Sequence, residues 1–382
     1  MSTPPLALYV HLPWCVRKCP YCDFNSHALK STAPDEGYID ALIRDFDLES
    51  PWVRGRTIET VFFGGGTPSL FPPEAFARLL AALRERVDFL PDAEVTLEAN
   101  PGTIERGRFA GYREAGINRV SLGAQTFSAR ALERLGRIHT PSDTLRAAAE
   151  LRAAGIGNFN LDLMYALPGQ RLDEAAADIE AACALAPAHL SHYQLTLEPG
   201  TPFHARPPPL PDEDAAWEMQ IECQSRLALA GYAQYEVSAY ARNGARCRHN
   251  LNYWLFGDYL GIGAGAHGKI SLAVPGRILR TEKPKWPREY QAAIASATEA
   301  IGLRRPAERR ELAFEYLLNA LRLNEGFREE QFQERTGLAI AEIAAPLERA
   351  RGRGLLEPTA DGWRASELGR RFLNDLQASF LD

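Results

Sequence analysis

The chain has 382 residues, of which 46% are hydrophobic and 24% charged, and its formal net charge is -6 at pH 7. This is the composition of an ordinary globular protein, and the acidic balance gives no global positive field that would attract nucleic acid or an anionic membrane. The opening sequence MSTPPLALYVHLP has no charged leader region, and no later segment approaches the roughly 18 apolar residues of a membrane span, so the sequence predicts a cytoplasmic protein.

Six short apolar or β-branched segments alternate with helical patterns, which is the order of repeated βα units. The segments are LALYVHL (6–12), TVFFGGG (60–66), EVTLEAN (94–100), RVSLGAQ (119–125), FNLDLMY (159–165) and LSHYQLTL (190–197). Among the helical patterns, PSDTLRAAAELRAAG offers Ser142 as an N-cap and Gly155 as a stop. The repeat predicts an α/β fold with a partial (β/α)6-type barrel over residues 1–240, and a doubly wound sheet is the alternative.

The rest of the chain differs in character. Residues 241–305 form a connecting segment that contains HNLNYW (249–254) and GAGAHG (263–268), and the strand-like KISLAV after the second motif indicates a tight turn near a cofactor pocket. Residues 306–382 show helical patterns followed by a hairpin-like LLEPTADGWRAS. They predict a small C-terminal helical domain, with a winged fold as a variant, and their balanced charges give no reason to expect nucleic acid.

Cys15, Cys19 and Cys22 form C-x3-C-x2-C directly after the first predicted strand. Three clustered thiols in a reducing compartment favour metal binding, but a structural zinc site needs four ligands, which here would require His11 or His27. An iron-sulfur cluster on three thiolates leaves one iron open to an outside ligand, which explains the lack of a fourth cysteine. Both alternatives follow from the residues alone.

The cysteine spacing resembles that of the radical S-adenosylmethionine (SAM) superfamily, in which it binds a [4Fe-4S] cluster and SAM chelates the fourth iron. The segment FFGGGTPS (62–69) follows the second predicted strand as the glycine motif of that superfamily does. Glycines suit this position because backbone carbonyls must approach the ammonium group of SAM closely. The resemblance therefore implies two cofactors, the [4Fe-4S] cluster and SAM.

The resemblance also implies a SAM site at the ends of the predicted strands. The residues concerned are Tyr9, Tyr21, Gly65, Gly66, Thr67, Glu98, Gln125, Arg137 and Asp162. The glycine loop and Glu98 would hold the methionine end, because a carboxylate suits an ammonium group, and Arg137 would pair with the SAM carboxylate. Gln125 and Asp162 would accept the ribose hydroxyls, and Tyr21 would lie beside the adenine.

Within the superfamily, YVHLPWC resembles the lead into the cluster loop of the branch that contains the oxygen-independent coproporphyrinogen III dehydrogenases (HemN) and the haem chaperones (HemW). The dehydrogenases have a further cysteine two residues after the third, where this sequence has Phe24. HNLNYW matches the HNxxYW motif that is associated with haem in the chaperones. The resemblance thus implies haem-binding candidates, which are His249, Asn250, Tyr253 and Trp254.

The predicted function is that of a haem chaperone, which carries a cluster and SAM, binds haem and delivers it to haem-accepting proteins. An imidazole can ligate haem iron, and aromatic rings can cover the macrocycle, with Cys247 as an alternative ligand. The alternative function is that of a radical SAM porphyrin-modifying enzyme such as an oxygen-independent coproporphyrinogen III dehydrogenase. The sequence leaves open whether SAM is cleaved, which protein accepts haem, and whether the chain forms a homodimer or a peripheral membrane contact.

Overall fold

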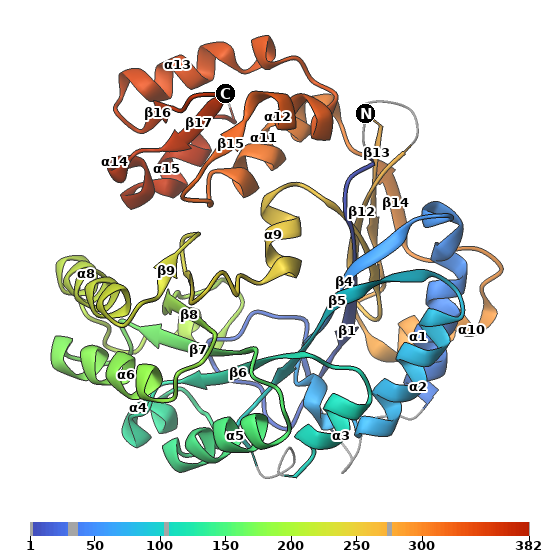
Figure 1. The fold of residues 1–382 in the computed structure, drawn as a ribbon, viewed down its shortest axis with the longest axis horizontal. Helices are drawn as coiled ribbons and strands as arrows, with labels where there is room; N and C mark the ends of the chain where they lie inside the picture. The colour runs from blue at the N-terminus through green and yellow to red at the C-terminus, as the bar shows by residue number, and fades with distance from the viewer. Residues whose placement is uncertain (1–2, 30–36, 103–106, 273–276, 382) are drawn as a thin grey trace.

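A computed structural model describes residues 3–29, 37–102, 107–272 and 277–381. Its centre is one twelve-stranded sheet with the strand order β14-β13-β12-β11-β1-β4-β5-β6-β7-β8-β10-β9 (Figure 1). The parallel part of the sheet consists of β11 (Asp258–Ile262), β1 (Leu6–Leu12), β4 (Thr57–Gly65), β5 (Asp88–Ala99), β6 (Arg119–Gln125), β7 (Phe159–Tyr165) and β8 (His189–Gln194). The six predicted strands are all present, and β11 adds a parallel strand that the sequence did not indicate.

Antiparallel strands extend both edges of the parallel part. The β8 edge carries β10 (Ala239–Ala241) and β9 (Ala233–Gln234), and the β11 edge carries β12 (His267–Ser271), β13 (Ile278–Glu282) and β14 (Leu303–Pro306). Within the described ranges the two outermost strands, β14 and β9, do not pair with each other, so the barrel stays open. The prediction of a partial barrel is confirmed, and the doubly wound alternative is wrong.

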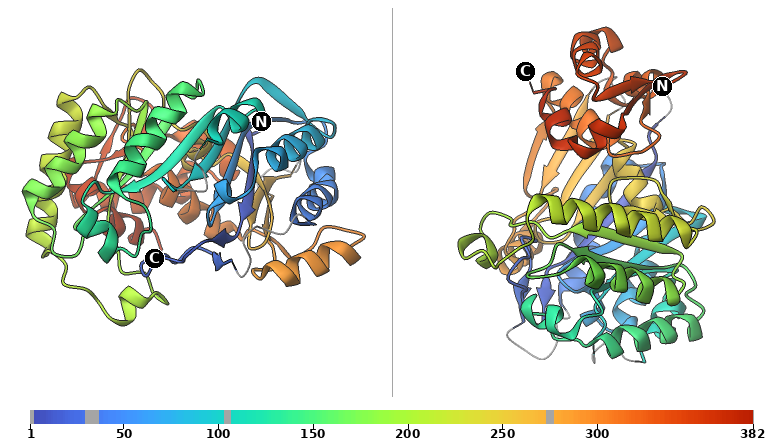
Figure 2. Two further views of the ribbon diagram at one scale, coloured as in Figure 1. Left: turned by 90° about the horizontal axis from the view of Figure 1, so that it is seen from below. Right: turned by 90° about the vertical axis from the view of Figure 1, so that its left-hand side faces the viewer.

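The helices of the βα units cover the outer, convex face of the curved sheet (Figures 1 and 2). They are α1 (Gly37–Glu49), α2 (Pro73–Arg84), α3 (Phe109–Glu114), α4 (Ala129–Arg134), α5 (Pro141–Ala153), α6 (Leu172–Ala184) and α8 (Glu213–Leu229). The shorter elements are α7 (Pro202–Ala205) and the 3-10 turns η1 (Ser50–Val53) and η2 (Pro68–Leu70), and α10 (Pro287–Ser296) packs beside α1. Each long helix buries one apolar stripe against strands that are buried on both faces, as parallel strands are.

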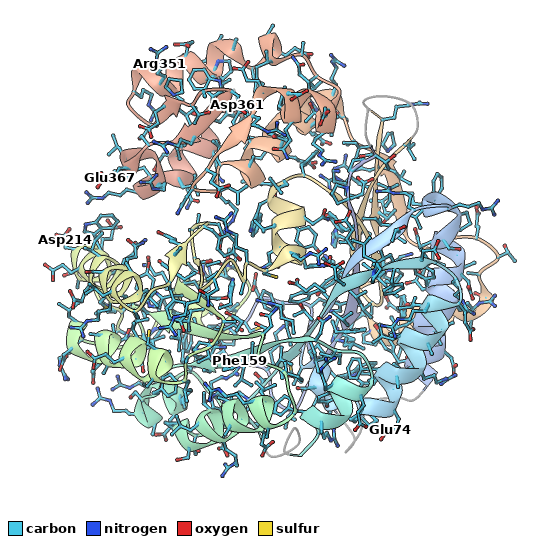
Figure 3. The ribbon with its side chains drawn as sticks, viewed as in Figure 1. Glu74, Phe159, Asp214, Arg351, Asp361 and Glu367 are labelled. Carbon is cyan, nitrogen blue, oxygen red and sulfur yellow. The ribbon has the colours of Figure 1, made fainter. Side chains whose placement is uncertain are left out.

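Local sequence signals account for most helix ends, with one correction. The N-cap of α5 is Thr140 and not Ser142, because Pro141 takes the first helical position and the Thr140 side chain accepts from the backbone N of Asp143. Gly155 follows the helix with φ of 75°, as expected of a stop. Figure 3 shows the result of this patterning, with Phe159 in the interior and Glu74 and Asp214 at the periphery.

The C-terminal part has a hydrophobic core that includes Tyr316, Phe332 and Trp363. Its elements are α11 (Arg309–Ala320), β15 (Phe327–Arg328), α12 (Glu329–Thr336), η3 (Ile340–Glu342), α13 (Ala344–Gly352), β16 (Leu356–Pro358), β17 (Gly362–Ala365), α14 (Glu367–Arg371) and α15 (Leu373–Ala378). Strands β16 and β17 form the expected hairpin beside the helices. This helical region lies at the open side of the sheet, where α11 contacts α9 (Arg248–Trp254) on the concave side (Figure 1). Among the described residues, no helix is both long and apolar enough to cross a membrane.

Candidate functional site

The cysteine loop leaves β1 and is closed by its own backbone. Two short parallel strands, β2 (Trp14–Cys15) and β3 (His27–Ala28), pair at its ends, and the backbone N of Leu29 donates to the Cys15 carbonyl at 2.9 Å. Within the loop, the backbone N of Cys22 donates to the Cys19 carbonyl at 3.2 Å. The three cysteines consequently line one cavity of about 380 Å³ at the carboxyl ends of the parallel strands.

The glycine loop after β4 packs directly on the cysteine loop. The backbone N of Gly66 donates to the Leu12 carbonyl at 2.9 Å, and that of Thr67 donates to the Trp14 carbonyl at 2.7 Å. A Cβ at Gly66 would come within 2.5 Å of the Trp14 carbonyl oxygen, and Gly65 has φ of 119°. The glycines are therefore required by contacts within the protein itself, in addition to any ligand.

Glu98 lies at the end of β5 and faces the same cavity. Its Oε2 accepts from the backbone N of Gly65 at 3.2 Å. Burial, together with the negative charge of Asp162, raises the pKa of Glu98 to about 8, although the Gly65 hydrogen bond opposes the shift. A cationic ligand would offset this cost, since an ammonium group beside the carboxylate stabilises the charged form.

The raised pKa of Glu98 predicts a pH-dependent effect of Glu98→Gln on stability. Between the unfolded pKa of about 4.3 and the folded pKa the native state binds more protons, so the Glu98 contribution to stability falls as the pH rises through this range. In urea unfolding without cofactors, the free energy of unfolding of Glu98→Gln relative to the parent should increase by about 1 kcal/mol or more between pH 5 and pH 9. A difference that stays constant over this range would contradict the assignment, because the cost of the buried amide does not titrate.

Arg137 lines the cavity and also contacts the cysteine loop and two neighbouring residues. Its Nη1 lies 3.8 Å from the Cys19 Sγ, and its Nη2 donates to the Gly123 carbonyl at 2.8 Å and to the Asn100 Oδ1. A Cβ at Gly123 would meet the guanidinium at 3.0 Å, so this glycine makes room for the arginine. Arg137 thus brings its positive charge close to the Cys19 thiol as well as to the cavity.

Asn100 is a cavity residue that sequence reasoning missed. Its Nδ2 donates to the Thr67 Oγ1 at 2.9 Å, and Thr67 in turn donates to the Cys15 Sγ at 3.5 Å. Asn100 could have been identified from its position at the end of the strand segment that supplies Glu98. Tyr193 and Glu198 lie near the end of β8 and also line the cavity, and sequence reasoning missed both.

Gln125, Asp162 and Tyr21, which were expected to contact SAM, line the same cavity as the cysteines. Gln125 adopts φ of 66° where the register between β6 and β7 shifts, and its Oε1 accepts from the Tyr193 hydroxyl at 3.0 Å. Asp162 accepts from the Ser121 Oγ at 3.0 Å and the Asn160 Nδ2 at 2.7 Å. A left-handed non-glycine residue at a strand end is a typical feature of a functional site.

The three thiols do not converge on a point at which one ion could bind. Burial raises the pKa of the Cys15 and Cys22 thiols. Within the described ranges, no three or more His, Cys, Asp or Glu side chains gather closely enough to hold one metal ion. A cubane cluster binds each thiolate through a different iron, so its ligands need not converge on one point. His11 and His27, the residues that could complete a zinc site, do not line this cavity.

Tyr9 and Tyr253 lie outside this cavity and line a second, more open hollow of about 780 Å³. The Tyr9 hydroxyl is 3.0 Å from the His11 Nδ1, and the His11 Nε2 is 2.8 Å from the Asn25 carbonyl oxygen. Tyr9 therefore holds the cysteine loop through His11. Gly65 and Glu98 form part of the wall of both spaces, which places the hollow beside the cavity.

The HNLNYW segment forms α9, whose first turn is fixed by Glu94. The Glu94 carboxylate accepts from the backbone N of Arg248 at 3.1 Å and that of His249 at 3.0 Å. The His249 ring is 1% exposed, with its Nδ1 at 2.8 Å from the Thr60 Oγ1 and its Nε2 at 3.0 Å from the Tyr253 hydroxyl. In this arrangement His249 offers no free nitrogen to an iron.

The other haem candidates divide between two environments. Trp254 faces the C-terminal region, where the Arg322 guanidinium lies 4.4 Å from its ring centre, and Asn250 is partly exposed. Of the four predicted residues, Tyr253 lines one of the two spaces described above, whereas His249, Asn250 and Trp254 line neither. Cys247 is buried at the start of α9 with its Sγ 3.7 Å from the Glu94 Oε1.

Comparison with known proteins adds independent findings. A family model described as the radical SAM superfamily matches residues 9–204, and the HemN C-terminal domain matches residues 307–372. The heme chaperone HemW of Escherichia coli (strain K12) is 48% identical over 381 residues, covering 100% of this chain and 99% of that protein. Heme chaperone HemW of Haemophilus influenzae is 45% identical, covering 99% of this chain and 98% of its own length.

A more distant relative and a solved structure are also similar to this chain. The mouse radical S-adenosyl methionine domain-containing protein 1, mitochondrial, is 36% identical over 98% of this chain and 87% of its own length. The solved structure of coproporphyrinogen III oxidase (HemN) from Escherichia coli, a radical SAM enzyme, has a TM-score of 0.83 at 23% identity and covers 99% of this chain and 90% of that one, which is a likeness of fold. The full-length identity and the family match together show that this chain belongs to the HemW family of the radical SAM superfamily.

Proposed function

We propose that the protein is a haem chaperone that holds a [4Fe-4S] cluster on Cys15, Cys19 and Cys22, binds SAM beside it and delivers haem to acceptor proteins. The observation that carries the cofactor part is the single cavity that these cysteines share with Glu98 and Arg137. The haem part is supported by the full-length similarity to proteins named heme chaperone HemW.

The residues of the cavity suit this role one by one. A cluster on the three thiolates supplies an open iron and an electron when it is bound. Glu98 would face the ammonium group of SAM. Gly65, Gly66 and Thr67 would line the space around the methionine end of SAM, because they lie beside Glu98 and Cys15. Gln125 and Asp162 line the same cavity and present acceptors for ribose hydroxyls, and Tyr21 offers a ring near Arg137.

The second candidate function is modification of a porphyrin by a radical SAM enzyme. Phe24 argues against the coproporphyrinogen dehydrogenase, because it occupies the position of the further cysteine in that family and is 61% exposed at the rim of the cavity. A thiol at this point would face both spaces, whereas a phenyl ring offers only an apolar surface.

Two measurements on one anaerobic preparation test the proposal. Haem titration of the cluster-loaded protein should give saturable binding with a defined Soret band. Incubation with coproporphyrinogen III, SAM and a reductant should give no multiple-turnover formation of protoporphyrinogen IX. Failure of the parent protein to bind haem would refute the chaperone function, and sustained decarboxylation would establish the enzyme instead.

A further inference from the structure

The second hollow is built by segments that are far apart in sequence. The cysteine loop supplies His27, α9 supplies Tyr253, β11 and β12 supply Tyr259 and His267, and the segment after β13 supplies Lys285 and Trp286. Its volume of about 780 Å³ exceeds that of the cysteine cavity, which is about 380 Å³. The lining combines aromatic faces, imidazoles and two lysines, Lys18 and Lys285, and it also includes the carboxyl groups of Asp23 and Glu98. The aromatic faces, imidazoles and lysines suit a planar metalloporphyrin with carboxylate arms.

We propose that haem binds in this hollow with His27 as its axial ligand, rather than through His249 of the HNLNYW segment. This inference rests on the proposed haem-carrier function and adds the site and the ligand. The occupant is a haem whose iron meets the His27 imidazole, whose face lies against Trp286 and Tyr259, and whose propionates approach Lys285.

His27 has the hydrogen-bonding pattern of a metal-binding histidine. Its Nε2 is shielded from solvent and has no hydrogen-bond partner among the described residues, although buried polar atoms nearly always have one. The ring is also hydrogen-bonded to the backbone of Lys285, and histidines that bind metals are commonly oriented by such a bond from the other ring nitrogen. Burial lowers the pKa of His27, which keeps the imidazole neutral as iron ligation requires.

Two exposed side chains, those of Trp286 and Lys285, lie beside His27. Trp286 lies 4.9 Å from the His27 ring, centre to centre, at an interplanar angle of 44°, and it is 60% exposed. Ligation of iron by the shielded Nε2 requires neighbouring groups to move, and the exposed indole of Trp286 has room to do so and then to lie against the macrocycle. Lys285 is 66% exposed, with Glu282 as a distant partner at 3.8 Å, so its ammonium group is free to pair with a propionate.

Asn25 of the cysteine loop connects this loop to the wall of the hollow by hydrogen bonds. Its Nδ2 donates to the Ala264 carbonyl at 2.9 Å and to the Lys285 carbonyl at 3.0 Å, and a Cβ at Gly265 would meet this amide at 2.3 Å. The GAGAHG turn, which the sequence indicated as a turn near a pocket, is thus part of the hollow. Haem in the hollow would lie directly beside the proposed SAM site.

His249 acts in this site as a positioning residue. Its Nε2 lies 3.0 Å from the Tyr253 hydroxyl, and the Tyr253 ring packs edge-on against that of Tyr259 with centroids 4.7 Å apart. Loss of His249 would loosen this aromatic wall without removing an iron ligand. The motif therefore supports haem binding through packing, and the coordinating imidazole comes from the cysteine loop.

The test compares histidine variants of the full-length, cluster-loaded protein under anaerobic conditions. Haem titrations followed by the Soret band should show that His27→Gly shifts the band and weakens binding roughly tenfold or more. Added imidazole should restore the spectrum of the parent, because it can enter the space left by the side chain. Trp286→Ala should weaken binding with an unchanged band, and His204→Ala, which removes an exposed imidazole outside both spaces, should behave like the parent.

The outcomes separate this inference from the proposed function. His27→Gln serves as a second variant that keeps the size of the side chain, and cluster absorption with far-UV circular dichroism verifies the fold of each variant. If the parent binds no haem, the carrier function fails. If the parent binds haem and the His27 variants keep its spectrum and affinity, while His249→Phe or His267→Ala changes the spectrum, the assignment of His27 is overturned and the carrier function stands.

Discussion

Replacing Cys15, Cys19 and Cys22 together by alanine is expected to abolish the broad visible absorption of the anaerobically reconstituted protein and to reduce its bound iron and sulfide to background. All three thiols line one cavity, and no other cysteine lines it. The fold should survive, because backbone hydrogen bonds such as that from Leu29 to Cys15 close the loop without the thiols. Iron and sulfide analysis and circular dichroism on the same samples measure both effects.

Cys183→Ala and Cys223→Ala are the matched controls for this prediction. Cys223 is buried in the core of the barrel, where burial raises the pKa of its thiol to about 12, and Cys183 lies partly buried on α6. Both variants should keep the full cluster content. A stoichiometric zinc ion that persists through iron and sulfide reconstitution, with no cluster formed, would refute the cluster assignment.

Lys283→Ala is expected to lower the free energy of unfolding by roughly 3–5 kcal/mol, because it leaves buried carboxylates without their cation. The Lys283 Nζ lies 2.8 Å from the Asp45 Oδ1 and also pairs with Glu49, and all three side chains are at most 1% exposed. Asp45 in addition accepts from the Tyr290 hydroxyl at 2.8 Å. This network joins α1 to the end of β13, next to the wall of the hollow.

Urea unfolding of Lys283→Ala and Lys285→Ala at pH 8 measures the effect. Lys285 is 66% exposed, so its variant should stay within about 0.5 kcal/mol of the parent. Burial raises the pKa of Glu49, and removal of Lys283 removes the main opposing influence, so the loss should shrink as the pH falls and protonation removes the unpaired charge of this carboxyl. Equal stability of the two variants at pH 8 would show that the buried pair contributes nothing.

Much of the fold followed from local patterns. The six strand segments, the helices between them and the C-terminal hairpin were recognisable because apolar periodicity and turn residues act over a few positions. Parallel strands present their carboxyl ends on the same side of a sheet, so residues at those ends are expected to lie together. Cys15, Glu98, Gln125 and Asp162 do line one cavity. The parallel strand β11 was not predicted because DYLGI is short and the helix before it, α9, spans only Arg248–Trp254.

The sequence by itself determined the order of elements, the cysteine loop and the family, because spacing and periodicity are properties of neighbouring residues. Only the tertiary structure decided what each side chain meets. The pairing of Thr60 and Tyr253 with His249 depends on how α9 seats against β4, and the placement of Trp286 over His27 depends on strands added at the far edge of the sheet. The contacts of Thr60 with His249 and of Trp286 with His27 join residues more than a hundred positions apart, and no local pattern encodes the register that creates them.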